Sequence, residues 1–454
     1  MLDVLRQGRP GPSPFWVGLV ARVRDAFGPT SPPPTLDALT RMLAEDPIFD
    51  EDYRAEMALL TEADGWKTPP YVDRLIFRPV GSRFRPGAAA AEWPVPRLES
   101  VPELAAHLEV PEATLEGWAD VGGWLGRYPS DRRQHYVRRW IPGVPGRRSR
   151  PTPLRRAAPG CAPCLRSSGG SGPRPIEAPK TQLAKMQRRI LRSILDLVPV
   201  HPAAHGFVRG RSIRTHAARH VHMQVVLRFD LRRFFPSVQA PRVQGLFRYL
   251  GYPEEVARLL AGLCTTITPH DVFPPRTAAD VRQLYRQRHL PQGAPTSPAL
   301  ANLLCLGLDR RMMGLARAFD AGYSRYADDL VFSGGAALAA RSRRFGGFVA
   351  RVVDEEGFQL NHDKTRRMPR SGRQEVTGLV VNRGPAYPRD EFDRLKAILH
   401  QCALDGPERH NREGHPDFRA HLLGRVSFVE SVDPRRGAKL RVRFERIRWG
   451  SSQR

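Results

Sequence analysis

The stretch Tyr323–Ser333, YSRYADDLVFS, places two adjacent carboxylates, Asp328 and Asp329, between two short apolar runs. Alternating apolar residues on both sides of the pair predict a β-hairpin with the acids at its tip. Neighbouring aspartates repel each other, so a fold that holds them between strands favours a divalent cation close by. A solvated acidic turn is the alternative for an isolated pair, and the rest of the chain decides between the two.

A third carboxylate ends another apolar strand, Val225–Asp230. Taken alone, Asp230 is typical of a helix N-cap or a turn. Together with Asp328 and Asp329, it would bring three carboxylates to one edge of a sheet. Such a set of hard oxygen ligands suits two Mg²⁺ ions, which can stabilise both the attacking and the leaving oxygen of a phosphoryl transfer.

A loop rich in proline, Leu290–Pro298, precedes a helical run over Ala299–Ala316. Its glycine allows the backbone to approach a ligand closely at the entrance to a helix, which fits nucleotide binding. An ordinary loop with an N-cap is the alternative at this position.

The 454 residues carry a formal net charge of +26, which indicates a polyanionic partner, nucleic acid first. Residues 1–97 hold 12 basic and 13 acidic side chains, whereas residues 98–454 hold 60 and 33, so the partner belongs to the second part. The sequence contains no 18-residue apolar span, no signal-peptide pattern and no lipidation motif. We therefore expect a cytoplasmic protein that does not bind a membrane. The five cysteines argue against a disulfide framework. Cys161 and Cys164 form a CxxC, which is either a zinc site or a pair of free thiols.

From Val225 onward, short strands alternate with helices, which predicts an α+β fold. Residues 1–97 form an N-terminal extension of unknown role. The segments expected to be helical are 36–46, 50–63, Leu98–Trp124, Leu183–Leu197 and most of 388–454. Residues 138–173 form an insertion with eight arginines and no acids, predicted as a mobile loop. We expect this insertion to grip RNA, so deleting residues 144–171 should weaken RNA affinity and flatten its salt dependence.

Several motifs together resemble those of reverse transcriptases. Phe229–Val238 (FDLRRFFPSV), Leu290–Leu303 (LPQGAPTSPALANL) and YSRYADDLVFS resemble the A, B and C motifs, in that order. Gly357–Met368 (GFQLNHDKTRRM) resembles the next motif, and Arg174–Leu191 (RPIEAPKTQLAKMQRRIL) resembles the motif of the fingers. The resemblance runs from about residue 100 to the C-terminus. It implies a right-hand polymerase fold, with fingers and an antiparallel palm sheet over 98–395 and a basic helical thumb over 396–454.

The resemblance also implies roles for individual residues. Asp230, Asp328 and Asp329 would be catalytic and would bind two Mg²⁺ ions, for which Mn²⁺ could substitute, with the backbone near Leu231 beside them. Phe235 would be the gate that excludes a ribose 2′-OH. The remaining nucleotide-binding residues would be Gln292 and Gly293 in the dNTP pocket, Arg174 on the triphosphate and Lys364 near the phosphates.

Two further elements are similar to those of retron reverse transcriptases. His216–His220 (HAARH) is similar to an Asn-Ala-x-x-His element, with histidine in place of asparagine, and Val376-Thr377-Gly378 matches a Val-Thr-Gly element. His205–Ser212 and Leu422–Leu440 also resemble that family. The resemblance implies RNA contacts by His216, His220, Val376, Thr377 and Gly378, although the two histidines could equally form a solvated helical i,i+4 pair.

A retron enzyme would bind its own structured noncoding RNA as template and primer. It would start DNA synthesis from a guanosine 2′-OH and would use dNTPs as substrates. Synthesis would produce an RNA–DNA hybrid and then RNA-linked single-stranded DNA (msDNA). Antiphage defence with an effector protein is the implied role. The alternatives are a stand-alone defence, group II intron or diversity-generating reverse transcriptase, and a catalytically silent RNA-binding scaffold.

Overall fold

A computed structural model describes residues 84–87, 90–123, 134–141, 174–275 and 277–449. The chain divides into two compact units. One unit combines the residues up to Val121 with Ala240–Gly262, and the other combines Gly122–Gln239 with Leu263–Arg454. Most of the expected extension, with the helices predicted over 36–46 and 50–63, lies outside the described residues.

The first unit is helical, with α5 (Val101–Leu108), α6 (Glu112–Ala119), α10 (Ala240–Tyr249) and most of α11 (Glu254–Cys264). Its first two helices replace the single helical run expected over Leu98–Trp124. Glu109 ends α5 in the left-handed region, with φ 57°, and Pro111 then provides the N-cap of α6. Helix α11 approaches α6 closely, because a Cβ on Gly262 would lie 2.5 Å from the carbonyl oxygen of Ala119.

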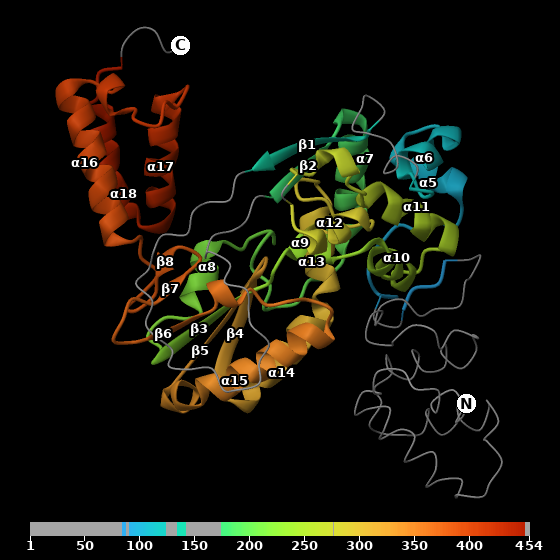
Figure 1. Ribbon diagram of the computed structural model, residues 1–454, viewed down its shortest axis with the longest axis horizontal. Coiled ribbons are helices and arrows are strands. Elements are labelled where there is room, and N and C mark those ends of the chain that lie inside the picture. The colour runs from blue at the N-terminus through green and yellow to red at the C-terminus, as the bar shows by residue number, and fades with distance from the viewer. Residues whose placement is uncertain (1–83, 88–89, 124–133, 142–173, 276, 450–454) are drawn as a thin grey trace, which may run out of the picture. The chain divides into compact units, whose positions relative to one another are not determined.

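The second unit contains a four-stranded antiparallel sheet with the order β4-β5-β3-β6 (Figure 1). The strands are β3 (Val225–Asp230), β4 (Ala321–Tyr326), β5 (Asp329–Gly334) and β6 (Arg366–Pro369). The residues of β3 are mostly buried, as the apolar run in its sequence predicts. β3 and β5 are the inner strands, and the carboxylates that they carry lie at one end of each strand, as the sequence suggested.

Helices α14 (Leu306–Ala318) and α15 (Ala336–Glu355) run along one side of this sheet, α14 against β4 and α15 against β3 and β5 (Figure 1). The helical run expected over Ala299–Ala316 is divided in two. Helix α13 (Ser297–Leu304) ends at Cys305, whose φ of −87° and ψ of 6° interrupt the helix before α14 begins.

A second, two-stranded sheet joins β1 (Tyr136–Ile141) to β2 (Arg174–Pro179), and α7 (Thr181–Ser193) and the 3₁₀ turn η2 (Leu195–Leu197) follow it. The prediction of a loop over 138–173 is therefore wrong for its first four residues, because they pair with β2. The rest of that insertion, with Cys161 and Cys164, lies outside the described residues.

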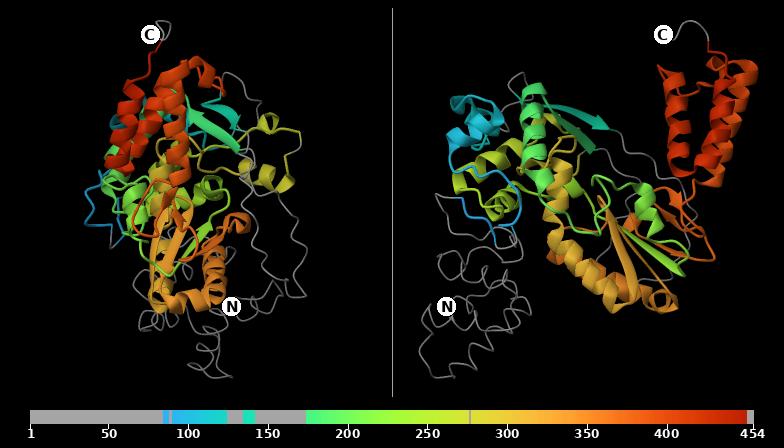
Figure 2. Two further views of the ribbon diagram at one scale, coloured as in Figure 1. Left: turned by 90° about the vertical axis from the view of Figure 1, so that its left-hand side faces the viewer. Right: turned by 180° about the vertical axis from the view of Figure 1, so that it is seen from behind.

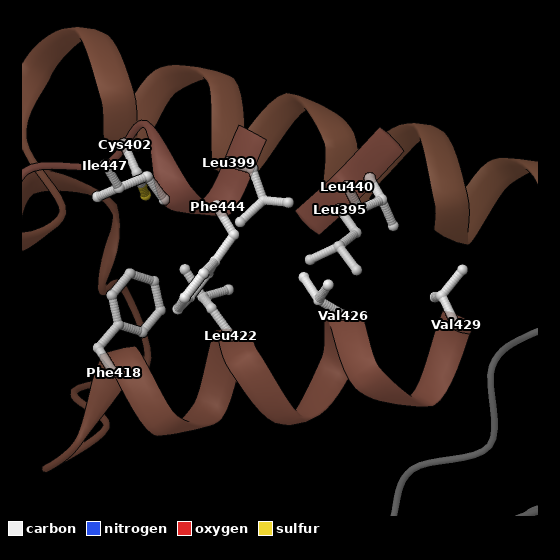
Figure 3. Packing of buried hydrophobic residues seen from close by; sticks show 10 residues of the cluster. All are labelled: Leu395, Leu399, Cys402, Phe418, Leu422, Val426, Val429, Leu440, Phe444 and Ile447. Atoms are coloured by element: carbon white, nitrogen blue, oxygen red, sulfur yellow. The ribbon is translucent and has the colours of Figure 1, made fainter. Parts of the chain in front are cut away.

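The C-terminal part of the second unit is a bundle of α16 (Arg389–Asp405), α17 (Phe418–Val432) and α18 (Pro434–Glu445), seen from two further directions in Figure 2. Ten buried residues, nine from these helices together with Ile447, point toward one another in the core of the bundle (Figure 3). The aspartates Asp417 and Asp433 cap α17 and α18. The helices expected over 388–454 are confirmed, and α16 crosses the expected boundary at residue 396.

The remaining elements of the second unit are short: α8 (Ile213–Ala218), α9 (Phe234–Ser237), η3 (His270–Val272), α12 (Ala279–Arg286), η4 (His362–Lys364), β7 (Glu375–Val376), β8 (Leu379–Val380) and η5 (Glu408–His410). Within the described ranges, no helix has the length and apolar character needed to cross a bilayer.

Candidate active site

The sheet brings Asp230 and Asp329 directly opposite each other, because they are partners in the antiparallel register of β3 and β5. Asp328 belongs to the two-residue turn between β4 and β5, in which Ala327 has a φ of 54°. The predicted hairpin with acids at its tip is confirmed. The backbone N–H of Leu231 donates to the carbonyl oxygen of Asp328 at 2.9 Å, which ties the turn to the end of β3.

Asp230 is the last residue of a strand, and the N-cap of the following helix α9 is Arg233. The interpretation of Asp230 as a helix cap is therefore wrong. Its side chain is almost fully buried, and both carboxylate oxygens accept hydrogen bonds. Asn361 Nδ2 donates to Oδ1 at 2.9 Å, and Lys364 Nζ lies 3.0 Å from Oδ2.

Asp329 is neutralised by Arg228, which lies two residues before Asp230 on the same strand. The guanidinium donates in a bidentate manner, with Nε 2.9 Å from Oδ1 and Nη2 2.7 Å from Oδ2. Burial raises the pKa of Asp329, whereas the charge of Arg228 and its hydrogen bonds lower it, and the net direction is upward. Paired arginine and carboxylate groups of this geometry hold each other in a fixed orientation.

The carboxyl group of Asp328 has a strongly raised pKa. Burial and the negative charges of Asp329 and then Asp230 raise the pKa of Asp328 to about 6. Burial and neighbouring negative charges disfavour the charged form of a carboxyl group, and a nearby cation would stabilise that form.

The three carboxylates fit a divalent metal by their chemistry, since Mg²⁺ takes hard oxygen ligands and leaves positions for waters and phosphates. In the part of the chain that the structure describes, no three His, Cys, Asp or Glu side chains form a closed metal site. Asp230 and Asp329 are instead oriented toward Lys364 and Arg228. The Lys364 side chain is 38% exposed, whereas that of Asp230 is buried.

The loop that is predicted to bind the nucleotide, Leu290–Pro298, lies against β2. The backbone N–H of Glu177 donates to the carbonyl oxygen of Gln292 at 2.8 Å. Gly293 has a φ of 129°, and a Cβ there would lie 3.1 Å from Ile176, so only glycine suits this position. Arg174 is exposed at the start of β2, the strand whose Glu177 is hydrogen-bonded to Gln292. Phe235 lies half-buried on α9.

A buried polar network holds β2 in place, and the sequence did not reveal it. Glu177 is fully buried and accepts from Arg138 Nε at 3.1 Å, Thr268 Oγ1 at 2.7 Å and His289 Nε2 at 2.9 Å. Burial alone would raise the pKa of Glu177, but His289 and then Arg138 hold it below its usual value. His289 stands three residues before Gln292, so the network fixes the pocket loop to β1 and β2.

A second buried network supports the turn with Asp328. Arg325 is fully buried and forms a bidentate ion pair with Asp309, at 2.8 and 2.7 Å. Its Nη1 donates to Asn302 Oδ1 at 2.9 Å and to the carbonyl oxygen of Ala327 at 3.1 Å. The arginine within the hairpin sequence was the only signal for this network, and nothing in the local sequence indicated Asp309 as its partner.

The two histidines expected at the RNA lie inside the protein. His216 and His220 are both fully buried, so the interpretation of a solvated i,i+4 pair is wrong. His220 contacts Ser333 Oγ at 2.8 Å and Ser324 Oγ at 2.6 Å. His216 Nδ1 lies 3.5 Å from Thr377 Oγ1, so the structure does bring the two retron-like elements together. Thr377 and Gly378, both with positive φ, form the turn after Val376 at the end of β7.

Comparison with known proteins agrees with this geometry. The family model described as reverse transcriptase (RNA-dependent DNA polymerase) matches residues 167–381. Such a match implies the right-hand fold of reverse transcriptases, a family that generally uses divalent metal ions, and the mixed helices and antiparallel sheets are consistent with it.

Three curated relatives carry the comparison further. The chain is 45% identical over 279 residues to the Retron Mx65 reverse transcriptase of Myxococcus xanthus, a match of 59% of this chain and 60% of that protein. It is 41% identical over 283 residues to the Retron Mx162 reverse transcriptase of the same species, covering 58% and 56%. The Retron Ec86 reverse transcriptase of Escherichia coli is 32% identical over 268 residues, covering 59% and 74%.

The chain thus spans about 60% of the length of the first two relatives and about three quarters of the third. The residues that match the family model include the Asp230, Asp328 and Asp329 carboxylates and the Gln292 loop. On these matches, the chain belongs to the family of retron reverse transcriptases.

Proposed function

We propose that this protein is an RNA-directed DNA polymerase of the retron type. The observation that carries the proposal is the pairing of Asp230 with Asp329 beside Asp328, three carboxylates from two adjacent strands and one tight turn. Two Mg²⁺ ions held by these carboxylates and the backbone carbonyl of Leu231 would supply charge neutralisation for phosphoryl transfer, with Mn²⁺ as a substitute.

The residues of the chain itself then bind and orient the substrates. The loop of Gln292 and Gly293 receives the dNTP, and Arg174 on the neighbouring strand contacts its triphosphate. Lys364, released from Asp230, provides a mobile cation beside the phosphates. The ring of Phe235 lies against the sugar and excludes a ribose 2′-OH. Positioning and neutralisation of charge are the main requirements of such a transfer.

The regions of the right-hand fold follow from this assignment. The β1–β2 sheet with α7 forms the fingers, the sheet β4-β5-β3-β6 with α14 and α15 forms the palm, and residues 396–454 form most of the thumb. Residues 98–395 are thus fingers and palm. His216, His220, Val376, Thr377 and Gly378 act on RNA through the surface that they shape, because the two histidines are buried.

The expected partner is a structured noncoding RNA that is both template and primer. The net charge of +26 supports a polyanionic partner, and the relatives are retron reverse transcriptases by name. The product is RNA-linked single-stranded DNA made in the cytoplasm through an RNA–DNA hybrid. The protein acts in antiphage defence together with an effector protein.

Sequencing of the nucleic acid that copurifies with the protein from its native host tests this function. RNA covalently linked to DNA of one defined sequence is the expected result, and Asp328→Asn should copurify with the RNA alone. Nucleic acid of random sequence, or DNA without linked RNA, would contradict the retron assignment.

A further inference from the structure

Phe207 combines two features that a folded chain normally avoids. Its side chain is 51% exposed, and its backbone has a φ of 61°, in the left-handed region that disfavours bulky residues. Among the described residues, the other exposed large apolar side chains lie within regular helices or strands. Phe207 is held in a loop, so its position must be imposed by its neighbours.

The neighbours that impose it belong to the catalytic hairpin. The backbone of Ala204 pairs with Arg325, and the N–H of His205 donates to the carbonyl oxygen of Arg325 at 2.7 Å. Gly206 then lies against the turn, where a Cβ would come within 2.5 Å of the Ala327 nitrogen. Asn302 Nδ2 donates to the carbonyl oxygen of Gly206 at 2.8 Å. The segment is therefore fixed to the turn that carries Asp328.

The ring of Phe207 lies in a row of aromatic side chains. Its centroid is 6.2 Å from that of Phe235 and 6.4 Å from that of Tyr326. The ring centroid of Phe235 also lies 5.5 Å from that of the buried Phe234, which lies 5.9 Å from that of Phe358. Phe235 thus contacts one buried ring and one exposed ring, which limits the rotation of its own ring.

We propose that Phe207 is a specificity-determining residue that holds Phe235 against the sugar of the incoming nucleotide. The inference rests on the proposed function, since Phe235 discriminates sugars only in a polymerase. Without the ring of Phe207, the ring of Phe235 can move away from the sugar. The site then accepts a nucleotide with a ribose 2′-OH. The strained backbone of residue 207 is retained because only that conformation directs the ring along the row.

The test is single-nucleotide incorporation, with kcat/KM measured for a dNTP and for the matching rNTP. Phe207→Asn is the informative variant, because asparagine tolerates the left-handed region and removes the ring without strain. Its selectivity for dNTP over rNTP should fall about tenfold, mainly through a lower KM for the rNTP. Its thermal stability should be equal to or above that of the original protein.

Two controls separate this role from a structural one. Phe207→Tyr retains an aromatic ring and should keep the selectivity. Phe348→Ala removes a partly exposed phenylalanine of α15 and should also leave the selectivity unchanged. An unaltered selectivity in Phe207→Asn, with dNTP incorporation intact, would overturn the inference alone. A protein that incorporates no dNTP even before substitution would instead contradict the proposed function.

Discussion

Lys364 and Asp230 form an ion pair at the end of β3, with Nζ 3.0 Å from Oδ2 and the carboxylate almost fully buried. The lysine occupies the carboxylate that the proposed reaction assigns to a metal ion. On the proposed function, Lys364 and a divalent cation would compete for the same carboxylate oxygen.

Substitution Lys364→Met should lower the free energy of unfolding by about 1 kcal/mol in the presence of a chelator, because the buried Asp230 loses its cation. Added Mg²⁺ should then stabilise the variant more than the original protein, since it no longer displaces a lysine. Thermal unfolding with and without Mg²⁺ measures both effects, with the exposed Lys396→Met as the control. An equal Mg²⁺-induced shift in the two proteins would show that Lys364 and the metal do not compete.

The buried pair of Arg325 and Asp309 predicts a large loss of stability. Arg325→Met leaves the fully buried Asp309 carboxylate without its cation, which should cost about 3–5 kcal/mol in denaturant unfolding. The matched control is Arg351→Met, which removes an exposed i,i+4 pair with Glu355 and should cost less than about 1 kcal/mol. Similar losses in both variants would contradict the special role of the buried pair.

Much of this site was predictable from local sequence. Apolar runs predicted β3 and the hairpin, and the pairing of Asp230 with Asp329 follows once both strands exist. The alternation along β3 also indicates that Arg228 shares a face with Asp230. The partners Asn361, Asp309 and His289 could not be predicted, because each is brought in by a contact over many residues that no local pattern encodes.

The burial of His216 and His220 could not be predicted from local sequence either. The i,i+4 spacing of His216 and His220 is that of an exposed helical pair, yet the helix α8 ends at Ala218 and both rings are covered. Their burial depends on β4 and β5, which supply Ser324 and Ser333 more than 100 residues away.

Burial of His216 and His220 predicts acid sensitivity. Burial, and next the neighbouring His220, lower the pKa of His216 to about 2, and burial followed by Arg219 lowers the pKa of His220 to about 3. The unfolded chain therefore takes up protons near pH 6.5 that the folded protein does not. The free energy of unfolding should fall by about 1.4 kcal/mol per pH unit for each histidine below that pH.

Urea unfolding at pH 7, 6 and 5 checks this dependence. His216→Asn should flatten the slope by the contribution of one histidine, whereas substitution of the exposed His400 should leave it unchanged. Parallel pH profiles for His216→Asn and the original protein would contradict the burial of an uncharged His216.

The raised pKa of Asp328 predicts that metal binding depends on pH. Below about pH 6 a proton occupies the carboxyl group, because burial and the charges of Asp329 and Asp230 favour the uncharged form. The affinity for Mg²⁺ should therefore fall by up to about tenfold per pH unit below that value. Isothermal titration at pH 5, 6 and 8 measures it, and Asp328→Asn should bind weakly at all three.

The most direct test of the polymerase centre is incorporation of a dNTP opposite an RNA template by Asp328→Asn, compared with Asp320→Asn. Asp320 is an exposed aspartate just before β4 and provides the matched change of charge. The account predicts that Asp328→Asn loses about a thousandfold in rate while binding RNA as before, and that Asp320→Asn keeps the original rate. Incorporation by Asp328→Asn at the original rate would contradict the assignment of DNA synthesis to this site.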